Sequence, residues 1–179
     1  MFLGYNHAGK IKFYTEQPLD PYIYNLEKVE ETQDEYVLDG DEFVLRTPEW
    51  DEKQLEEAKQ LKYEEALLKA KDFEQNGCVE YKNAKFEMSD SNRNNLRETQ
   101  EALTLMGQES TEWNDKDDNI ITLTIEDIQY IRLNLILNAV RTLWIESYPA
   151  YLVQIAEAQT VEEVNNIVIN YEVPNGISI

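Results

Sequence analysis

The sequence predicts an α+β protein: a small strand-rich N-terminal segment followed by a mainly helical body that contains a short β-hairpin. Up to residue 46, apolar residues occur in short runs between turn-forming clusters, which is typical of strands. From Thr47-Pro48 onward they recur at spacings of three and four, which is typical of helices. We therefore expect a strand-rich attachment segment at 1–46, a helical domain at 47–173 with a hairpin at 78–88, and an irregular tail at 174–179.

Composition narrows the function classes. The chain has 179 residues, a net charge of −20, 42% hydrophobic residues and a single cysteine. Acids outnumber bases in each of the segments 1–48, 49–75, 76–125 and 126–179, so we expect no surface for nucleic acid or anionic lipid. No apolar run approaches the roughly 20 residues of a membrane helix, and the first residues lack a signal-peptide pattern. The lone Cys78 excludes an internal disulfide and suits a reducing compartment.

The N-terminal segment contains two turn signals. The cluster Asn6-His7-Ala8-Gly9 separates apolar runs, and Asp39-Gly40-Asp41 separates the runs at 35–38 and 42–45. Asp-Gly between apolar runs is the strongest short-range hairpin signal. Pro18 and Pro21 restrict any strand between these signals to a short or edge strand.

The first helix is expected to begin near Thr47-Pro48 and to run to Gln75, because threonine caps helices and proline suits the first helical position. Its apolar face consists of Tyr63, Ala66, Ala70 and Phe73. We expect Asn76-Gly77 to end it, with glycine in the left-handed cap conformation. After the hairpin at 78–88, one of Ser89, Asp90 and Ser91 caps a helix that runs to about Met106 and stops at Gly107; its apolar face is Leu96, Leu103 and Met106.

Residues 108–119 read as a polar loop around Trp113, followed by a short strand at 121–123. Thr124 and Asp127 form a capping-box pattern that opens a third helix. Its apolar residues cover so much of its surface that we expect it to be buried on most sides, with Leu135 and Trp144 in the core, and to kink or break at Pro149. Thr160 and Glu163 open a last short helix whose inward residues are Val161, Val164 and Val168.

Few residues invite a chemical role. His7 is the only histidine and lies in a predicted turn, whereas Cys78 lacks a neighbouring base and reads as a small hydrophobe. Asp115, Asp117, Asn119 and Glu126 match positions 1, 3, 5 and 12 of a calcium loop, but Ile120 stands where that loop needs glycine. We therefore predict no catalytic, cofactor-binding or metal-binding residue and no enzymatic activity.

Several short motifs occur in an order that resembles a phage and prophage tail-region domain of unknown function, over residues from about Trp50 to Tyr171. They are Phe73-Glu74-Gln75-Asn76-Gly77, Lys85-Phe86-Glu87-Met88-Ser89, Asp90-Ser91-Asn92-Arg93-Asn94-Asn95-Leu96, Trp113 with Asp117-Asp118-Asn119, Leu123-Thr124, and Ala158-Gln159-Thr160-Val161-Glu162-Glu163. Tyr5-Asn6-His7-Ala8-Gly9-Lys10-Ile11 is similar to the strand-turn-strand start of many tail-associated proteins.

The resemblance implies a non-enzymatic structural component of a bacteriophage tail, associated with the tail fibre or baseplate. It would be produced in the bacterial host cytoplasm and located in the virion tail. Its expected partners are other phage tail proteins, bound through the N-terminal segment, and further copies of itself, with a trimer or higher ring preferred by analogy. Two alternatives stay open: a tail-fibre assembly chaperone, and an acidic nucleic-acid mimic that inhibits a host defence protein.

Overall fold

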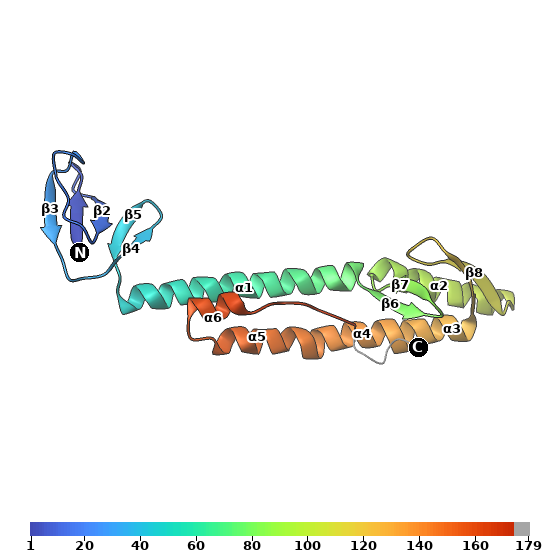
Figure 1. Ribbon diagram of the computed structural model, residues 1–179. Coiled ribbons are helices and arrows are strands. Elements are labelled where there is room, and N and C mark those ends of the chain that lie inside the picture. Colours follow the sequence, from blue (N-terminus) through green and yellow to red (C-terminus); the bar gives the residue numbers. More distant parts are fainter. Residues whose placement is uncertain (174–179) are drawn as a thin grey trace. The chain divides into compact units, whose positions relative to one another are not determined.

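A computed structural model describes residues 1–173, and the chain divides into two compact units, Met1–Glu56 and Glu57–Ile179 (Figure 1). The first unit contains five strands and the first turns of α1, and the second contains helices and two hairpins. The predicted α+β class is confirmed. Helix α1 runs through the division at Glu56, ten residues beyond residue 46, where the strand-rich segment was predicted to end.

The N-terminal unit contains a three-stranded antiparallel sheet and a hairpin. The sheet order is β2 (Ile11–Thr15), β1 (Phe2–Tyr5), β3 (Lys28–Glu31). The hairpin joins β4 (Tyr36–Asp39) to β5 (Glu42–Leu45) through Gly40, whose φ of 61° is the left-handed conformation that the Asp-Gly signal predicts. Residues 21–25 form a turn between β2 and β3.

Helix α1 (Pro48–Asn76) has the predicted ends and the predicted apolar face. Ala66 and Ala70 are fully buried, and Tyr63 and Phe73 pack beside them. The expected reason for Gly77 was wrong, since its φ is not positive. A Cβ there would lie 2.4 Å from the carbonyl oxygen of Phe73 and 2.6 Å from Met88 Cε, so glycine allows a close approach.

The predicted hairpin and second helix follow. Strands β6 (Cys78–Tyr81) and β7 (Ala84–Glu87) turn through Lys82 and Asn83, both at positive φ. Ser89 then caps α2 (Asp90–Met106), and Gly107 ends it at φ 65°. Leu96 and Leu103 are buried as expected, but Met106 lies 70% exposed, so its assignment to the apolar face was wrong.

The expected polar loop at 108–119 is wrong, because most of it belongs to a hairpin. Strand β8 (Ser110–Asn114) pairs with β9 (Ile120–Thr124), and only residues 115–119 form the turn. Polar residues dominate β8, yet Thr111 and Trp113 alternate with exposed residues on one face. Pairing with β9 therefore overrides the local preference for a loop.

One long helical stretch runs from residue 125 to 157. It comprises α3 (Ile125–Tyr130), η1 (Ile131–Ile136), α4 (Leu137–Thr142), η2 (Leu143–Ser147) and α5 (Tyr148–Glu157), in which η1 and η2 are π-helical. Thr124 and Asp127 make both bonds of the predicted capping box. The helix does not break at Pro149, which lies in the first turn of α5 directly after the wider turns of η2.

This long helix is less buried than predicted. Leu135 is 1% exposed, as expected of a core residue, and Trp144 is half-buried. Other apolar residues stay exposed, which contradicts burial on most sides; they are Leu133, Leu137, Ile145 and Val153. The last short helix, α6 (Val161–Asn166), shows a similar difference, since only Val164 is buried while Val161 and Val168 are exposed.

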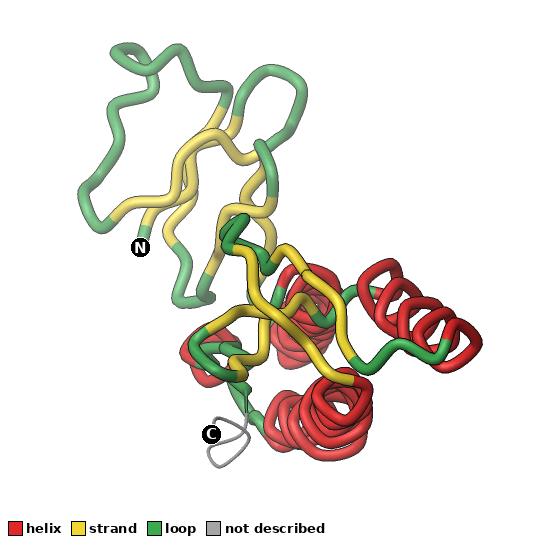
Figure 2. The backbone as a smooth tube through the Cα atoms, turned by 90° about the vertical axis from the view of Figure 1, so that its right-hand side faces the viewer, coloured by secondary structure: helices red, strands yellow, loops and turns green. Residues whose placement is uncertain are grey.

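In the helical unit, α1 and the row from α3 to α5 run antiparallel and lie side by side (Figures 1 and 2). One apolar cluster joins α1, the α3–α5 row and the segment at 167–171. A larger cluster joins both hairpins, α2 and the start of the long helix. No helix among residues 1–173 has the length and apolar character needed to cross a bilayer. The irregular tail predicted at 174–179 lies outside the described residues.

Candidate functional site

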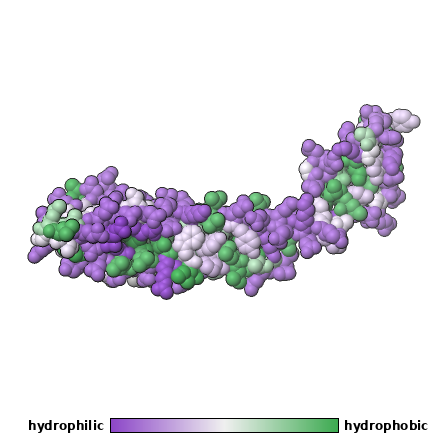
Figure 3. All heavy atoms as spheres, turned by 180° about the vertical axis from the view of Figure 1, so that it is seen from behind, coloured by the Kyte–Doolittle hydropathy of each residue, from purple (hydrophilic) through white to green (hydrophobic). Residues whose placement is uncertain are grey.

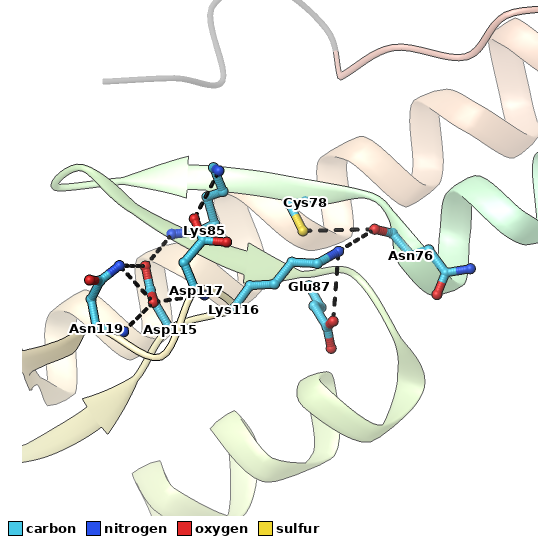
Figure 4. A network of polar contacts seen from close by, with 8 residues as sticks. All are labelled: Asn76, Cys78, Lys85, Glu87, Asp115, Lys116, Asp117 and Asn119. Atoms are coloured by element: carbon cyan, nitrogen blue, oxygen red, sulfur yellow. Dashed lines mark hydrogen bonds and ion pairs between the residues drawn. The ribbon is translucent and has the colours of Figure 1, made fainter.

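The strongest metal candidate, Asp115, holds the turn between β8 and β9 (Figure 4). Its carboxylate is buried and accepts hydrogen bonds from the backbone N–H groups of Asp117 (2.9 Å), Asn119 (2.8 Å) and Lys85 (3.2 Å). The Asn119 amide adds two more at 3.2 Å. Burial opposes ionisation of Asp115, but these donors outweigh it and lower its pKa. Both oxygens are thus engaged by N–H donors.

The neighbouring charges connect this turn to the first hairpin. Lys85 on β7 pairs with Asp117 at 2.8 Å, and Lys116 reaches the carbonyl oxygen of Asn76 at 2.8 Å and the carboxylate of Glu87 at 3.7 Å (Figure 4). These contacts therefore hold the β8–β9 turn against the β6–β7 hairpin. Glu126 lies apart from it in the first turn of α3. Among residues 1–173, no three histidine, cysteine or acidic side chains form a group that could hold a metal ion.

A second buried acid, Asp127, organises the start of α3. Its carboxylate accepts from Tyr81 Oη at 2.6 Å, from Lys82 Nζ at 2.8 Å and from the backbone N–H of Thr124 at 3.0 Å. Burial works against the charge, but the bonds from Lys82, Tyr81 and Thr124 prevail and lower the pKa of Asp127 to about 2. This ion pair ties the β6–β7 turn to the long helix. The capping-box pattern predicted the bond to Thr124, but nothing local in the sequence predicted Lys82.

The two other singled-out residues occupy ordinary positions. His7 is exposed in its turn, 3.5 Å from Asn25 Oδ1. Cys78 is half-buried at the start of β6, with Sγ 3.8 Å from the carbonyl oxygen of Asn76. Both contacts are to neutral oxygen atoms, which do not activate a histidine or a thiol for acid–base or nucleophilic chemistry.

The described helical unit has shallow hollows. One of about 340 Å³ lies between the end of α1 and the segment at 169–171. Another of about 500 Å³ lies between α2 and η1 and is lined by Arg97, Gln100, Glu101, Thr104, Leu105 and Arg132. Arg132 forms a hydrogen bond with Gln100, and Arg97 approaches Glu101 at 3.9 Å. Side chains of the same chain therefore already contact both arginines.

The N-terminal unit presents the most distinctive surface. Within Met1–Glu56, Leu3 and Leu26 are the only buried hydrophobic residues. The turn after Pro21 exposes Tyr22 by 94%, Ile23 by 75% and Tyr24 by 42%. Asp20 fixes this turn, because its carboxylate accepts from the N–H groups of Tyr22 (2.9 Å) and Ile23 (3.4 Å).

The strands of the N-terminal unit carry further aromatic side chains, which pack on one another. Tyr24 packs on Phe13 with ring centroids 5.2 Å apart, and Tyr14 packs between Tyr36 (5.6 Å) and Phe43 (6.3 Å). The sequence analysis expected at most a short or edge strand near Pro18 and Pro21 and missed the turn at 21–25. The available signal was the run Asp20-Pro21-Tyr22-Ile23-Tyr24, in which aspartate and proline favour a turn and three large apolar residues occupy it.

Compared with known proteins, the chain matches no family model, no curated protein and no solved structure. The resemblance to a phage tail-region domain therefore stays a prediction.

Proposed function

We propose that this chain is a non-enzymatic structural component of a bacteriophage tail, associated with the tail fibre or baseplate. It attaches to other tail proteins through its N-terminal segment and works as a homo-oligomer in the virion, after production in the bacterial host cytoplasm. The exposed apolar turn Tyr22-Ile23-Tyr24 carries this proposal, on a unit with only two buried hydrophobic residues. The motif resemblance over Trp50–Tyr171 supplies the biological setting.

The physical reason is the shortage of core in the N-terminal unit. A small unit buries too little apolar surface to offset the entropy of ordering its chain. Contact with a partner would cover Tyr22 and Ile23 and add the missing burial. Aromatic residues are enriched in protein interfaces, and a turn already fixed by Asp20 loses little entropy when it docks.

The placement of the buried acids supports a structural role for the helical unit. Asp115 stabilises a hairpin turn, and Asp127 stabilises a helix start and its contact with the β6–β7 turn. In both cases the carboxylate is occupied by protein donors. Both carboxylates therefore stabilise the fold.

The proposal is tested on washed particles from the host that encodes the chain. Mass spectrometry should find the wild-type protein in the particles. The variant Tyr22→Ser/Ile23→Ser should remain soluble in the lysate but be lost from the particles, because both side chains are exposed and their removal leaves the fold intact. Leu105→Ser, which changes an 88% exposed residue of the helical unit, is the matched control and should stay incorporated.

Absence of the wild-type protein from particles would overturn the virion proposal. If the protein then co-purified with a tail-fibre protein from the lysate, the assembly chaperone would replace it. Retention of the Tyr22/Ile23 variant in particles would overturn attachment through this turn.

A further inference from the structure

The long helix between residues 131 and 155 repeats every four residues. Its inward row comprises Ile131, Leu135, Ala139, Leu143, Ser147, Tyr151 and Ile155, of which Ile131, Leu135, Ala139, Leu143 and Ile155 are buried. An α-helix has about 3.6 residues per turn, so a strict four-residue row would drift around it. The π-helical turns of η1 and η2 are wider, and alternating them with α turns keeps the row on one side.

A second row lies two residues further along the chain, which is half a turn in this four-residue repeat. It is also mostly apolar. We call it the outer row: Leu133, Leu137, Arg141, Ile145, Pro149 and Val153. Its four large apolar members are 46%, 53%, 62% and 55% exposed, in the order Leu133, Leu137, Ile145, Val153. The row beside it, at 134, 138, 142, 146, 150 and 154, is polar apart from Ala150.

Figure 3 shows green, apolar side chains at the surface of the helical unit along the side where the α3–α5 row runs. Large apolar side chains on the face opposite the core do not stabilise the monomer, because they stay in contact with water. The outer row spans about 30 Å of helix, at about 1.5 Å per residue. An exposed, mostly apolar stripe of this kind marks an interaction surface.

We infer that the outer row is the contact between two copies of this chain, packed antiparallel about a two-fold axis at the level of Leu143. Reversing the row about that level places Leu133 opposite Val153 of the partner subunit and Leu137 opposite Pro149 of the partner subunit. Four of the five apolar members of the row then meet an apolar residue, and Ile145 lies opposite Arg141. A two-fold contact requires this self-complementarity.

The charges of the row favour a second copy of this chain as the partner and an antiparallel direction of packing. Arg141 is the one charged member of the outer row, and Glu146 flanks its centre. Within residues 1–173, neither side chain has an ion pair or a hydrogen bond of its own. In the antiparallel pairing Arg141 faces Ile145 of the partner subunit, next to Glu146 of the partner subunit, and the arrangement occurs twice across the axis. A parallel pairing would set Arg141 against its own copy, and like charges in contact oppose association.

This contact deepens the homo-oligomer part of the proposed function, and it replaces the expected ring by two-fold pairing at this surface. It is tested on the purified full-length protein, whereas the virion proposal is tested on particles. Either can therefore fail without the other.

Cysteine cross-linking tests the direction. In a Cys78→Ser background, Leu133→Cys and Val153→Cys are made as separate single variants. Mixed and oxidised, they should form a cross-linked dimer, because the two positions face each other. Each variant alone should stay uncross-linked, since its own copies lie about 30 Å apart. Cross-linking of a single variant alone would overturn the antiparallel pairing.

Association itself is measured by light scattering and sedimentation at about 150 mM salt, where screening limits repulsion between chains of net charge −20. The wild type should have twice the 21.0 kDa mass of the chain. Ile145→Lys, Arg141→Glu and Glu146→Arg should each weaken dimerisation by at least about tenfold. The double variant Arg141→Glu/Glu146→Arg should restore it, because both ion pairs re-form with reversed sign.

Leu105→Lys is the matched control, since Leu105 is 88% exposed, more than Ile145 at 62%, but lies on α2, and it should leave the dimer unchanged. Circular dichroism of each variant checks that the fold is retained. A wild type that is monomeric at about 100 μM, or a dimer indifferent to Ile145→Lys and to the charge reversals, would overturn the inference.

Discussion

At the scale of single residues, Asp127 links two parts of the helical unit through one carboxylate. It is 7% exposed and is held by Lys82, Tyr81 and the start of α3. A charge this deep is stable only while its donors remain in place. Asp127 therefore makes the contact between the β6–β7 turn and α3 dependent on pH.

Asp127→Asn should cost on the order of 2 kcal/mol of unfolding free energy at pH 7, because the pKa falls from 3.8 to about 2 on folding. A lowered folded-state pKa gives stability above pH 4 that is lost as the pH falls toward 2. The difference between wild type and variant in urea melts should therefore narrow across that window. Asp118→Asn, at an exposed turn position, is the control and should cost less than about 0.5 kcal/mol. A penalty for Asp127→Asn that is the same at pH 7 and pH 2 would contradict this account.

Calcium should leave the melting temperature unchanged. The Asp115 oxygens already accept from N–H groups, and Glu126 lies outside the turn. Thermal melts with millimolar CaCl₂, with MgCl₂ as the ionic control, check this expectation. A calcium-specific rise of about 4 °C or more would show that the turn rearranges to bind the ion.

The residue-level sequence analysis was accurate where the chemistry is local. The capping box at Thr124 and Asp127, the cap at Ser89 and the stop at Gly107 depend on neighbours within a few positions, and all three are confirmed. The calcium-loop pattern also read the acids as a local group, but their partner Lys85 lies thirty positions from Asp115. The spacing of the acids in the sequence could not show which groups donate hydrogen bonds to the Asp115 carboxylate.

At the scale of elements, the long helix shows why one apolar pattern can have two meanings. Its sequence is apolar on most sides, which predicted burial on most sides. The structure buries the inward row and exposes the outer row. Sequence periodicity counts apolar faces but does not say whether the same chain or another chain covers each one.

The inward row should carry the stability of this helix. Leu135→Ala should cost about 2–5 kcal/mol, because Leu135 is 1% exposed in the larger apolar cluster and its truncation leaves a cavity. Leu61→Ala, at a 68% exposed position on α1, should cost less than about 0.5 kcal/mol. Denaturant melts compare the two. A loss below about 1 kcal/mol for Leu135→Ala would mean that this part of the helix is not packed as described.

The segment after α6 depends on α1 for its position. Tyr171 donates its hydroxyl hydrogen to the carbonyl oxygen of Ala66 at 3.1 Å, and Lys62 and Lys69 donate to the carbonyls of Ile167 (3.3 Å) and Ile169 (3.1 Å). These bonds replace the regular ladder that the segment lacks. The sequence analysis could not find them, since a hundred or more positions separate the partners.

Tyr171→Phe should cost about 1 kcal/mol at pH 7, the usual net value of one hydrogen bond. Burial, together with the charges of Tyr151 and Tyr148, raises the pKa of Tyr171 to about 12. A raised folded-state pKa gives stability that is full below pH 10 and is lost as the pH rises toward 12. The wild type should therefore lose stability across that window relative to Tyr171→Phe. Tyr22→Phe, at a 94% exposed position, is the control and should behave as wild type.

At the scale of the whole molecule, the two compact units differ in how well they support themselves. Glu57–Ile179 contains both apolar clusters, whereas Met1–Glu56 contains two buried leucines. The sequence predicted a strand-rich segment followed by a helical body, through its change from strand-like runs to helical spacing. It placed the boundary at the start of α1, because it could not show that the first turns of that helix belong with the strands.

Expressed alone, residues 57–179 should fold with a dominantly helical circular dichroism spectrum and a cooperative melt. Residues 1–56 alone should show no cooperative melt, because a unit of this size with two buried hydrophobic residues cannot offset its conformational entropy. In the full chain, limited proteolysis should accordingly cut first within residues 1–56. A mostly strand spectrum for 57–179 would contradict the fold. A cooperative melt of 1–56 would show that the strands are stable without a partner, and it would remove the physical reason for the docking of Tyr22 and Ile23.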